Sequence, residues 1–267
     1  MVVKNLLKLI KDLRNRTGAS LVECKKSLLL FNGDIELAID HLRKLGIDRS
    51  LNKSSNLALE GSIFLYRKKN IAGILELNCE TDFVSKNRLF VDFGNLIVKT
   101  AVLEHIKDIN QIIKKFEKFR LELISKFSEN ILFRKFFLLE GFDVRDYLHL
   151  NRIGVLVDFN KCNKKRLGKE IAMHITASKP KFLSKDSVPF SIFDRERKIQ
   201  FDLASSLGKS IEITNKIVSG RMNKFFKEIV LLEQNFIFDD QVTVSDYLNK
   251  NNSLINSFVR FEVGDTY

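Results

Sequence analysis

Two glycine-containing segments recur along the chain, and this recurrence sets the strongest limit on its fold. Glu60-Gly61 reappears as Glu140-Gly141, and Gly73-Ile74-Leu75 reappears as Gly154-Val155-Leu156. Each strand-like run leads into a helical pattern. The matches are short, so alone they are weak evidence for a duplication. Because strands and helices segregate along the chain, the pattern predicts an α+β fold with two related halves.

The spacing of apolar residues predicts the elements of both halves. GSIFLYR and IAGILELN flank the polar Lys68-Lys69-Asn70, which predicts a β-hairpin over residues 61–79. The further expected elements are helices from about Asp82, over residues 109–127 and over residues 164–178, and a final strand over residues 258–263.

Residues 1–46 predict three short helices with a small core of their own. The signals that begin and end these helices are the Thr17-Gly18 break, the Ser20–Glu23 capping box, the Asn32-Gly33 turn, the Asp34 cap and the Gly46 stop. The polar stretch Asp48–Asn56 is expected to be a linker. A helical module this small usually binds something.

Residues 187–227 predict a helical hairpin that protrudes from the core. Gly208 sits at its centre. The apolar positions form narrow seams with charges between them. They are Ile192, Ile199 and Leu203 in the first helix and Val218, Met222 and Phe225 in the second.

Composition limits the compartment and the partners. Three cysteines lie far apart without a C-x-x-C pair, and no run of about 18 apolar residues is present, so a reducing cytoplasmic setting without a membrane span is expected. The net charge of +12 is compatible with nucleic acid or an acidic protein as partner, or with codon bias toward lysine.

Four patterns could carry chemistry, and each has a simpler interpretation. Gly208-Lys209-Ser210 lacks the first glycine of a phosphate loop. Cys79 has no adjacent base and is expected to be a buried strand cysteine. His174 with Glu170 is expected to form a helix pair. The basic residues from Lys161 to Lys169 are expected to be a solvated helix start. The sequence therefore predicts no enzyme and no cofactor or metal site.

The stretch Thr81-Asp82-Phe83-Val84 remains open on physical grounds. Thr81 or Asp82 could cap a helix whose buried face starts at Phe83. Alternatively, the start of a helix is a rigid place from which an aromatic ring and an acid can reach a partner.

Several ordered blocks resemble the bacterial elongation factor Ts family. They are LRNRTGASLVECKKSL, NGDIELAIDHLRK, ELNCETDFVSKN, RIGVLV, IAMHITASKP, GRMNKFFKE and FVRFEVG, and they cover nearly the whole chain. One departure is that the sequence stops at Tyr267, where many members carry a further helical module, so that module's contribution is in doubt.

The resemblance implies a domain organisation. It implies a UBA-like three-helix docking module at residues 1–50, a core N-subdomain at 51–140, and a core C-subdomain at 141–186 and 228–267. Residues 187–227 would be an inserted coiled-coil or dimerisation module.

The resemblance also implies a function and a site. The chain would be the guanine nucleotide exchange factor of EF-Tu, with Phe83 wedged between partner helices and Asp82 disturbing the groups that hold Mg²⁺. Thr81 and Val84 complete that stretch, and His149 would contact the partner near its phosphate loop. EF-Tu is the expected partner, with a homodimer possible through the hairpin and no specific nucleic acid or membrane. The alternative is a basic RNA-binding protein.

Overall fold

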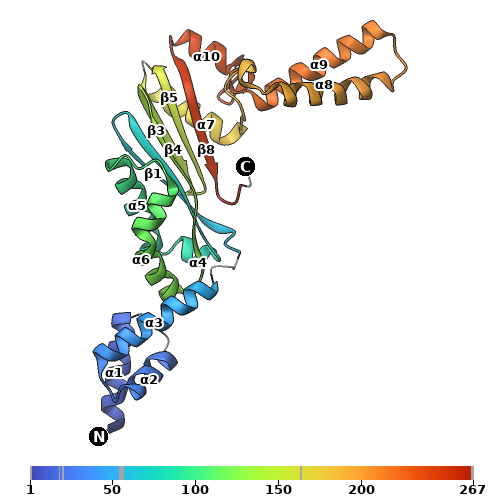
Figure 1. The fold of residues 1–267 in the computed structure, drawn as a ribbon. Coiled ribbons are helices and arrows are strands. Elements are labelled where there is room, and N and C mark those ends of the chain that lie inside the picture. The colour runs from blue at the N-terminus through green and yellow to red at the C-terminus, as the bar shows by residue number, and fades with distance from the viewer. Residues whose placement is uncertain (1, 18, 20, 54–56, 163, 266–267) are drawn as a thin grey trace. The chain divides into compact units, whose positions relative to one another are not determined.

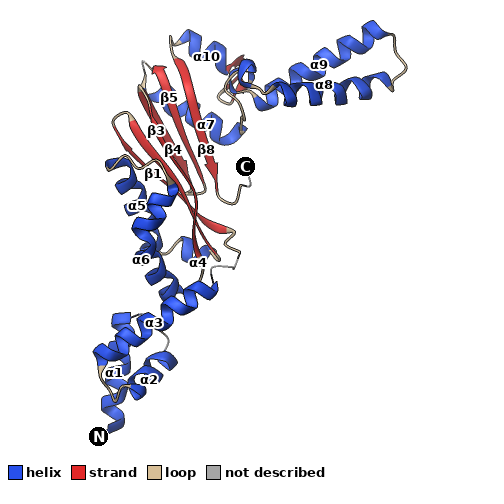
Figure 2. Cartoon of the chain, in the orientation of Figure 1, coloured by secondary structure: helices blue, strands red, loops and turns tan. Residues whose placement is uncertain are grey.

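A computed structural model describes residues 2–17, 19, 21–53, 57–162 and 164–265 (Figure 1). The chain forms two compact units. The first comprises Met1–Tyr66, Gly73–Leu138 and Glu262–Tyr267, and the second comprises Arg67–Ala72 and Leu139–Phe261. Helices and antiparallel strands segregate along the chain, as Figure 2 shows, so the predicted α+β class is confirmed.

The first sheet has the order β1 (Glu60–Lys68), β2 (Ile71–Cys79), β3 (Ile131–Glu140). The predicted hairpin over residues 61–79 is confirmed. Eight of the nine residues of the central strand β2 are buried, because helices and both neighbouring strands cover it. Helices α5 (Arg88–Leu103) and α6 (Ile109–Phe127) supply the rest of this core, in which Phe90 and Ile112 pack with Leu75 and Leu77. The expectation of a helix over residues 109–127 is confirmed.

The helix expected from Asp82 is broken. Helix α4 covers only Asp82–Ser85, and α5 begins at Arg88. The Asn87 side chain accepts a hydrogen bond from the Leu89 N–H at 3.0 Å and so caps α5. Asparagine is among the preferred N-cap residues, which explains why a new helix starts here.

The second sheet repeats the plan of the first. Its order is β4 (Asp143–His149), β5 (Ile153–Lys161), β8 (Leu254–Glu262), with the hairpin strand β5 in the centre. Helix α7 (Lys165–Ser178) packs on β4 and β5. Gly73 and Gly154 both lie in the central strand of a sheet, and each hairpin is followed by helices.

The N-terminal helices are α1 (Val2–Thr17), α2 (Leu21–Leu30) and α3 (Ile35–Lys53). Asp34 caps α3 as predicted, since its Oδ1 accepts the Leu37 N–H at 3.0 Å. Their shared core consists of Ile10, Leu13, Cys24, Leu28, Ala38, Ile39 and Leu42. Of the predicted signals, Gly18 and Ser20 lie outside the described residues.

The predicted stop at Gly46 is wrong, because α3 continues to Lys53 through the first part of the expected linker. A glycine inside a helix costs only about 1 kcal/mol relative to alanine, and no proline follows that would end the helix. Residues 54–56 of the expected linker lie outside the described residues.

Helices α8 (Phe190–Ser205) and α9 (Ile211–Ile229) run side by side and form the predicted hairpin (Figure 1). Gly208 lies between them with φ +64°. The seam of α9 is largely as predicted, but that of α8 is wrong. Phe193 and Ala204 pack against α9, whereas Ile192, Ile199 and Leu203 are 39–52% exposed. Each packed residue follows a predicted one by a single position, so the face of α8 that contacts α9 is rotated by about 100° from the predicted face.

Backbone hydrogen bonds join the segment before α8 to the end of α9 and the residues that follow it. The Phe182 N–H donates to the Ile229 carbonyl at 3.0 Å, and the Leu231 N–H donates to the Phe182 carbonyl at 2.8 Å. The side-chain amide of Gln234 also donates to the Glu228 carbonyl at 3.0 Å. The remaining elements are the short helices η1 (Lys185–Ser187) and η2 (Leu231–Glu233), strands β6 (Asn235–Phe236) and β7 (Asp239–Thr243), and helix α10 (Val244–Lys250).

His174 does not form the predicted pair with Glu170. Its imidazole is buried and lies 3.0 Å from Oε1 of Gln234, while Nδ1 accepts the Ile237 N–H at 3.3 Å. Glu170 instead accepts from Arg166 at 2.7 Å and from the Tyr247 hydroxyl at 2.5 Å. The predicted His174–Glu170 pair is wrong because His174 faces the core, where loop residues from far along the chain contact it.

Candidate functional site

The junction between β2 and α4 presents one aromatic ring to solvent. Phe83 is 82% exposed, while its neighbour Val84 is 7% exposed and joins the core of the first unit. The interpretation of Phe83 as the start of the buried helix face is therefore wrong, because Val84 takes that place. Burial of a phenylalanine ring is favourable, so a ring left in water at a folded junction is available to a partner.

A carboxylate from another segment braces this junction. The Thr81 N–H donates to Glu129 Oε2 at 3.0 Å, and the Thr81 hydroxyl donates to Glu129 Oε1 at 2.6 Å. In return, the Asn130 N–H donates to Glu80 Oε1 at 2.7 Å. Hydrogen bonds to charged groups are among the stronger ones in proteins, so the backbone before Phe83 is held firmly.

The Thr81 side chain therefore does not cap α4. Thr81 occupies the N-cap position with extended backbone, but its side chain makes no capping hydrogen bond. The hydroxyl is engaged by Glu129 instead. The predicted capping role is wrong for this side chain, because a long-range carboxylate outcompetes the local backbone.

Asp82 is a charged and accessible neighbour of the ring. Its Oδ2 lies 2.6 Å from Lys86 Nζ, and both side chains are at least half exposed. The hydrogen bond and the charge of Lys86 lower the pKa of Asp82, so the carboxylate is ionised at neutral pH. Exposed ion pairs contribute little stability, so Asp82 can exchange Lys86 for another cationic group at small cost.

Cys79 lies beneath the junction and is a structural group. It is fully buried, and its Sγ donates to the Thr81 carbonyl at 3.1 Å. Burial first, and then the carboxylates of Glu129 and Glu60, raise the pKa of the Cys79 thiol to about 12. The thiol is therefore protonated at neutral pH and a poor nucleophile, as expected for a buried strand cysteine.

His149 belongs to the other unit, at the end of β4. It pairs with Ile153 across the hairpin and is exposed. Its Nδ1 lies 3.2 Å from the Tyr147 hydroxyl, which orients the ring. Leu150 and Asn151, both with positive φ, form the turn that follows.

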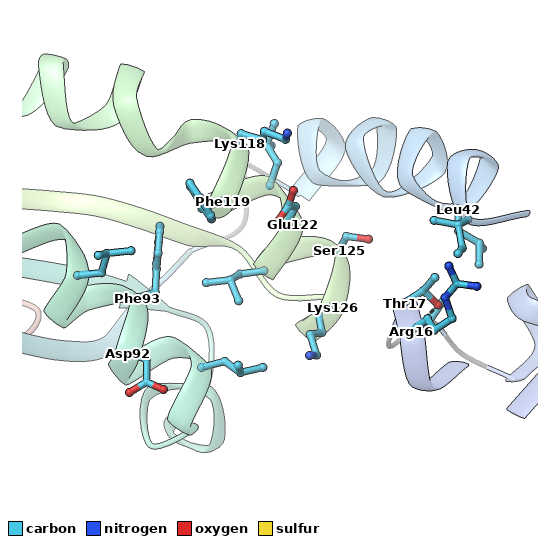
Figure 3. A pocket seen from close by; sticks show the side chains of 16 residues that line it. Arg16, Thr17, Leu42, Asp92, Phe93, Lys118, Phe119, Glu122, Ser125 and Lys126 are labelled. Atoms are coloured by element: carbon cyan, nitrogen blue, oxygen red, sulfur yellow. Dashed lines mark hydrogen bonds between the residues drawn. The ribbon is translucent and has the colours of Figure 1, made fainter. Parts of the chain in front are cut away.

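A cavity of about 550 Å³ lies in the first unit (Figure 3). Phe93 of α5 and Phe119 of α6 line it together with Leu42 of α3. Basic and acidic side chains both surround it, namely Arg16, Lys118, Lys126, Asp92 and Glu122. This mixture of apolar surface and opposite charges defines no particular ligand. Among the described residues, no cluster of His, Cys, Asp or Glu could hold a metal ion, and no helix could cross a membrane.

Comparison with known proteins decides the family. The model of the family described as Elongation factor TS matches residues 80–265. The chain belongs to the elongation factor Ts family. It is 50% identical over 257 residues to elongation factor Ts of Buchnera aphidicola subsp. Acyrthosiphon pisum (strain 5A), covering 96% of both chains. It is 46% identical over 259 residues to that of Photorhabdus laumondii, covering 96% of this chain and 91% of the relative.

Membership in elongation factor Ts makes the chain a translation elongation factor and confirms the resemblance. The family match spans Thr81–Val84, Glu129 and His149. Sequence reasoning missed Glu80 and Glu129. Each of the two segments, residues 80–81 and 129–130, supplies a glutamate that accepts a backbone N–H of the other segment. Nothing in the local sequence indicates that these two segments meet.

Proposed function

We propose that the chain is a guanine nucleotide exchange factor that binds EF-Tu with GDP and promotes GDP release. The observation that carries this proposal is the 82% exposed Phe83 ring on a braced strand-to-helix junction in an elongation factor Ts chain. Nucleotide exchange requires no covalent chemistry. It requires a rigid projection that fits one shape of the partner better than another.

The mechanism follows from how proteins hold GDP. Backbone N–H groups cradle the phosphates, and Mg²⁺ bridges their oxygens. Phe83 would enter between helices of EF-Tu, and the Asp82 carboxylate would disturb the groups that hold Mg²⁺. His149 would contact the partner near its phosphate loop. A factor that favours the nucleotide-free shape must weaken GDP binding by the same coupling factor.

The rest of the chain would provide affinity. The three N-terminal helices would dock on the nucleotide domain of EF-Tu, and the second sheet with β8 would hold another domain. The net charge of +12 would accelerate encounter, an effect that fades with salt. The proposed place of action is the cytoplasm, where translation supplies EF-Tu.

An RNA-binding function has less support. Two of the basic residues around the start of α7 already have partners: Lys164 Nζ contacts Asn251 Oδ1 at 3.2 Å, and Arg166 pairs with Glu170 at 2.7 Å. We therefore propose no specific nucleic-acid partner. Sequence-selective RNA binding at about 200 mM salt would favour the alternative, since nonspecific phosphate contacts weaken steeply there.

Release of fluorescent GDP from EF-Tu tests the proposed function. The chain is expected to accelerate release in the presence of Mg²⁺, and to accelerate it less after EDTA has removed the metal. Asp82→Ala should slow release in Mg²⁺ and lose most of that effect in EDTA. Release that is unchanged by the wild-type chain would refute the exchange function.

The brace at Glu129 provides a separate prediction. Glu129→Ala removes both hydrogen bonds to Thr81, so we expect a stability loss of about 1–3 kcal/mol and slower GDP release. Glu129→Gln can still accept the Thr81 N–H and should recover most of both properties. Urea titration and stopped-flow GDP release measure the two effects. Full exchange activity in a destabilised Glu129→Ala chain would show that the brace serves stability alone.

We further propose that two copies associate through the outer face of α8. Ile192, Ile199 and Leu203 form an exposed apolar stripe at helical spacing. Ile199→Glu places a charge in the centre of this stripe and is expected to raise the dimer dissociation constant by about tenfold or more. Sedimentation equilibrium measures it, and identical sedimentation of both chains would refute the stripe as the contact.

A further inference from the structure

The turn between β4 and β5 holds a leucine in an unfavourable backbone conformation. Leu150 has φ +49° and Asn151 has φ +57°, and the Arg152 N–H donates to the His149 carbonyl at 2.9 Å. Positive φ at both central residues is the pattern of a type I′ turn, which favours Asn and Gly. Asparagine suits its position. A leucine Cβ is crowded against the backbone in this region.

Leu150 differs from the other described residues with positive φ. Apart from glycines, these are Asn32, Lys69, His105, Ser128, Asn151, Lys179 and Asn252, all of which are polar. Leu150 alone among them is apolar. Its side chain is 81% exposed, so packing within the chain does not offset the backbone strain.

The surrounding hairpin holds this leucine in place. Leu148 pairs with Gly154 and His149 pairs with Ile153, so the strands remain in register up to the turn. His149 is exposed immediately before Leu150, and its ring is oriented by Tyr147. An apolar side chain and an imidazole therefore project from one rigid end of the hairpin.

We propose that Leu150 is a partner-contacting residue that inserts into an apolar recess of nucleotide-free EF-Tu beside the contact proposed for His149. This inference rests on the proposed function and extends it to a residue outside the Thr81–Val84 stretch. Burial of the leucine side chain against the partner favours binding, and because the turn is already formed, little conformational entropy is lost on binding.

The substitution Leu150→Asn separates this role from a structural one. Asparagine tolerates positive φ, so the melting temperature should stay the same or rise by about 1–4 °C. Affinity for nucleotide-free EF-Tu should fall by about tenfold, because the buried apolar contact is lost. Leu150→Met keeps an apolar side chain and should retain most of the affinity. Calorimetric titration with EF-Tu and thermal melts measure both effects.

Leu57→Asn is the matched control, because Leu57 is 80% exposed and has no assigned role. It should leave EF-Tu affinity unchanged. Equal EF-Tu affinities of the wild type and Leu150→Asn would overturn the Leu150 contact. A Leu150→Asn chain that both binds weakly and melts at a lower temperature would also overturn it, because the weaker binding would then follow from lost stability. Failure of the wild-type chain to accelerate GDP release would overturn the exchange function instead, and binding is measured separately from release to distinguish the two.

Discussion

Replacing Phe83 with alanine should slow the GDP release that this chain promotes from EF-Tu by tenfold or more, on the order of 1.4 kcal/mol, while folding stability changes by less than about 1 kcal/mol. The ring is 82% exposed, so its removal leaves no cavity in the core. Most of the proposed contact surface lies elsewhere, so binding to nucleotide-free EF-Tu should persist. The variant should lose its preference for the opened partner, and only that preference drives release.

Phe90→Ala is the matched control for the Phe83 measurement. Phe90 is fully buried in the same unit and packs near Phe64, with ring centroids 6.1 Å apart. Its truncation should cost about 3–5 kcal/mol of stability. Urea titrations of both variants and stopped-flow release of fluorescent GDP give the comparison. A stable Phe83→Ala chain with normal GDP release would refute the role of Phe83 in exchange and would leave Thr81–Val84 as an ordinary helix start.

Gly61→Ala should destabilise the chain by about 3–5 kcal/mol, a large effect for a single added methyl group. Gly61 has φ +153°, and a Cβ there would lie 2.3 Å from the Leu77 carbonyl oxygen and 2.8 Å from the Asn78 Cα. Both obstacles are backbone atoms of β2, which cannot move without disturbing the sheet. Because β2 leads directly into Thr81, GDP release should slow as well.

Gly220→Ala controls for the change from glycine to alanine itself. Gly220 lies in α9 with nothing within 4 Å of an added Cβ. Alanine should stabilise that helix by about 0.5–1 kcal/mol. Urea midpoints followed by circular dichroism measure both variants. A Gly61→Ala chain as stable as wild type would mean that β1 and β2 can separate at this point without loss.

Local patterns predicted much of the fold because the forces that create them act within a few residues. The Lys69-Asn70 turn between two apolar runs and the 109–127 helix were predictable from spacing alone. Asp34 was predictable as a cap because its side chain bonds a backbone N–H only three residues away. The family was identifiable from ordered blocks along the whole chain.

Errors occurred where the answer depended on distant segments. The spacing of Ile192 and Ile199 indicates an apolar stripe on α8, but a neighbouring stripe through Phe193 faces α9. His174 has Glu170 at helical spacing, yet a buried position brings it to Gln234 instead. In both cases, burial against another element outweighs the weak pairing available within one helix.

The sequence by itself determined the α+β class, the repeated strand pairs, the helical hairpin and the stretch Thr81–Val84 as the candidate site. Only the tertiary structure decided that Val84 is buried while Phe83 stands in solvent. It also placed Glu129 against Thr81, 2.6 Å from its hydroxyl, and left Leu150 exposed at positive φ. The reason is physical: strand and helix patterns arise between near neighbours, whereas exposure and bracing depend on which distant segments occupy the surrounding space.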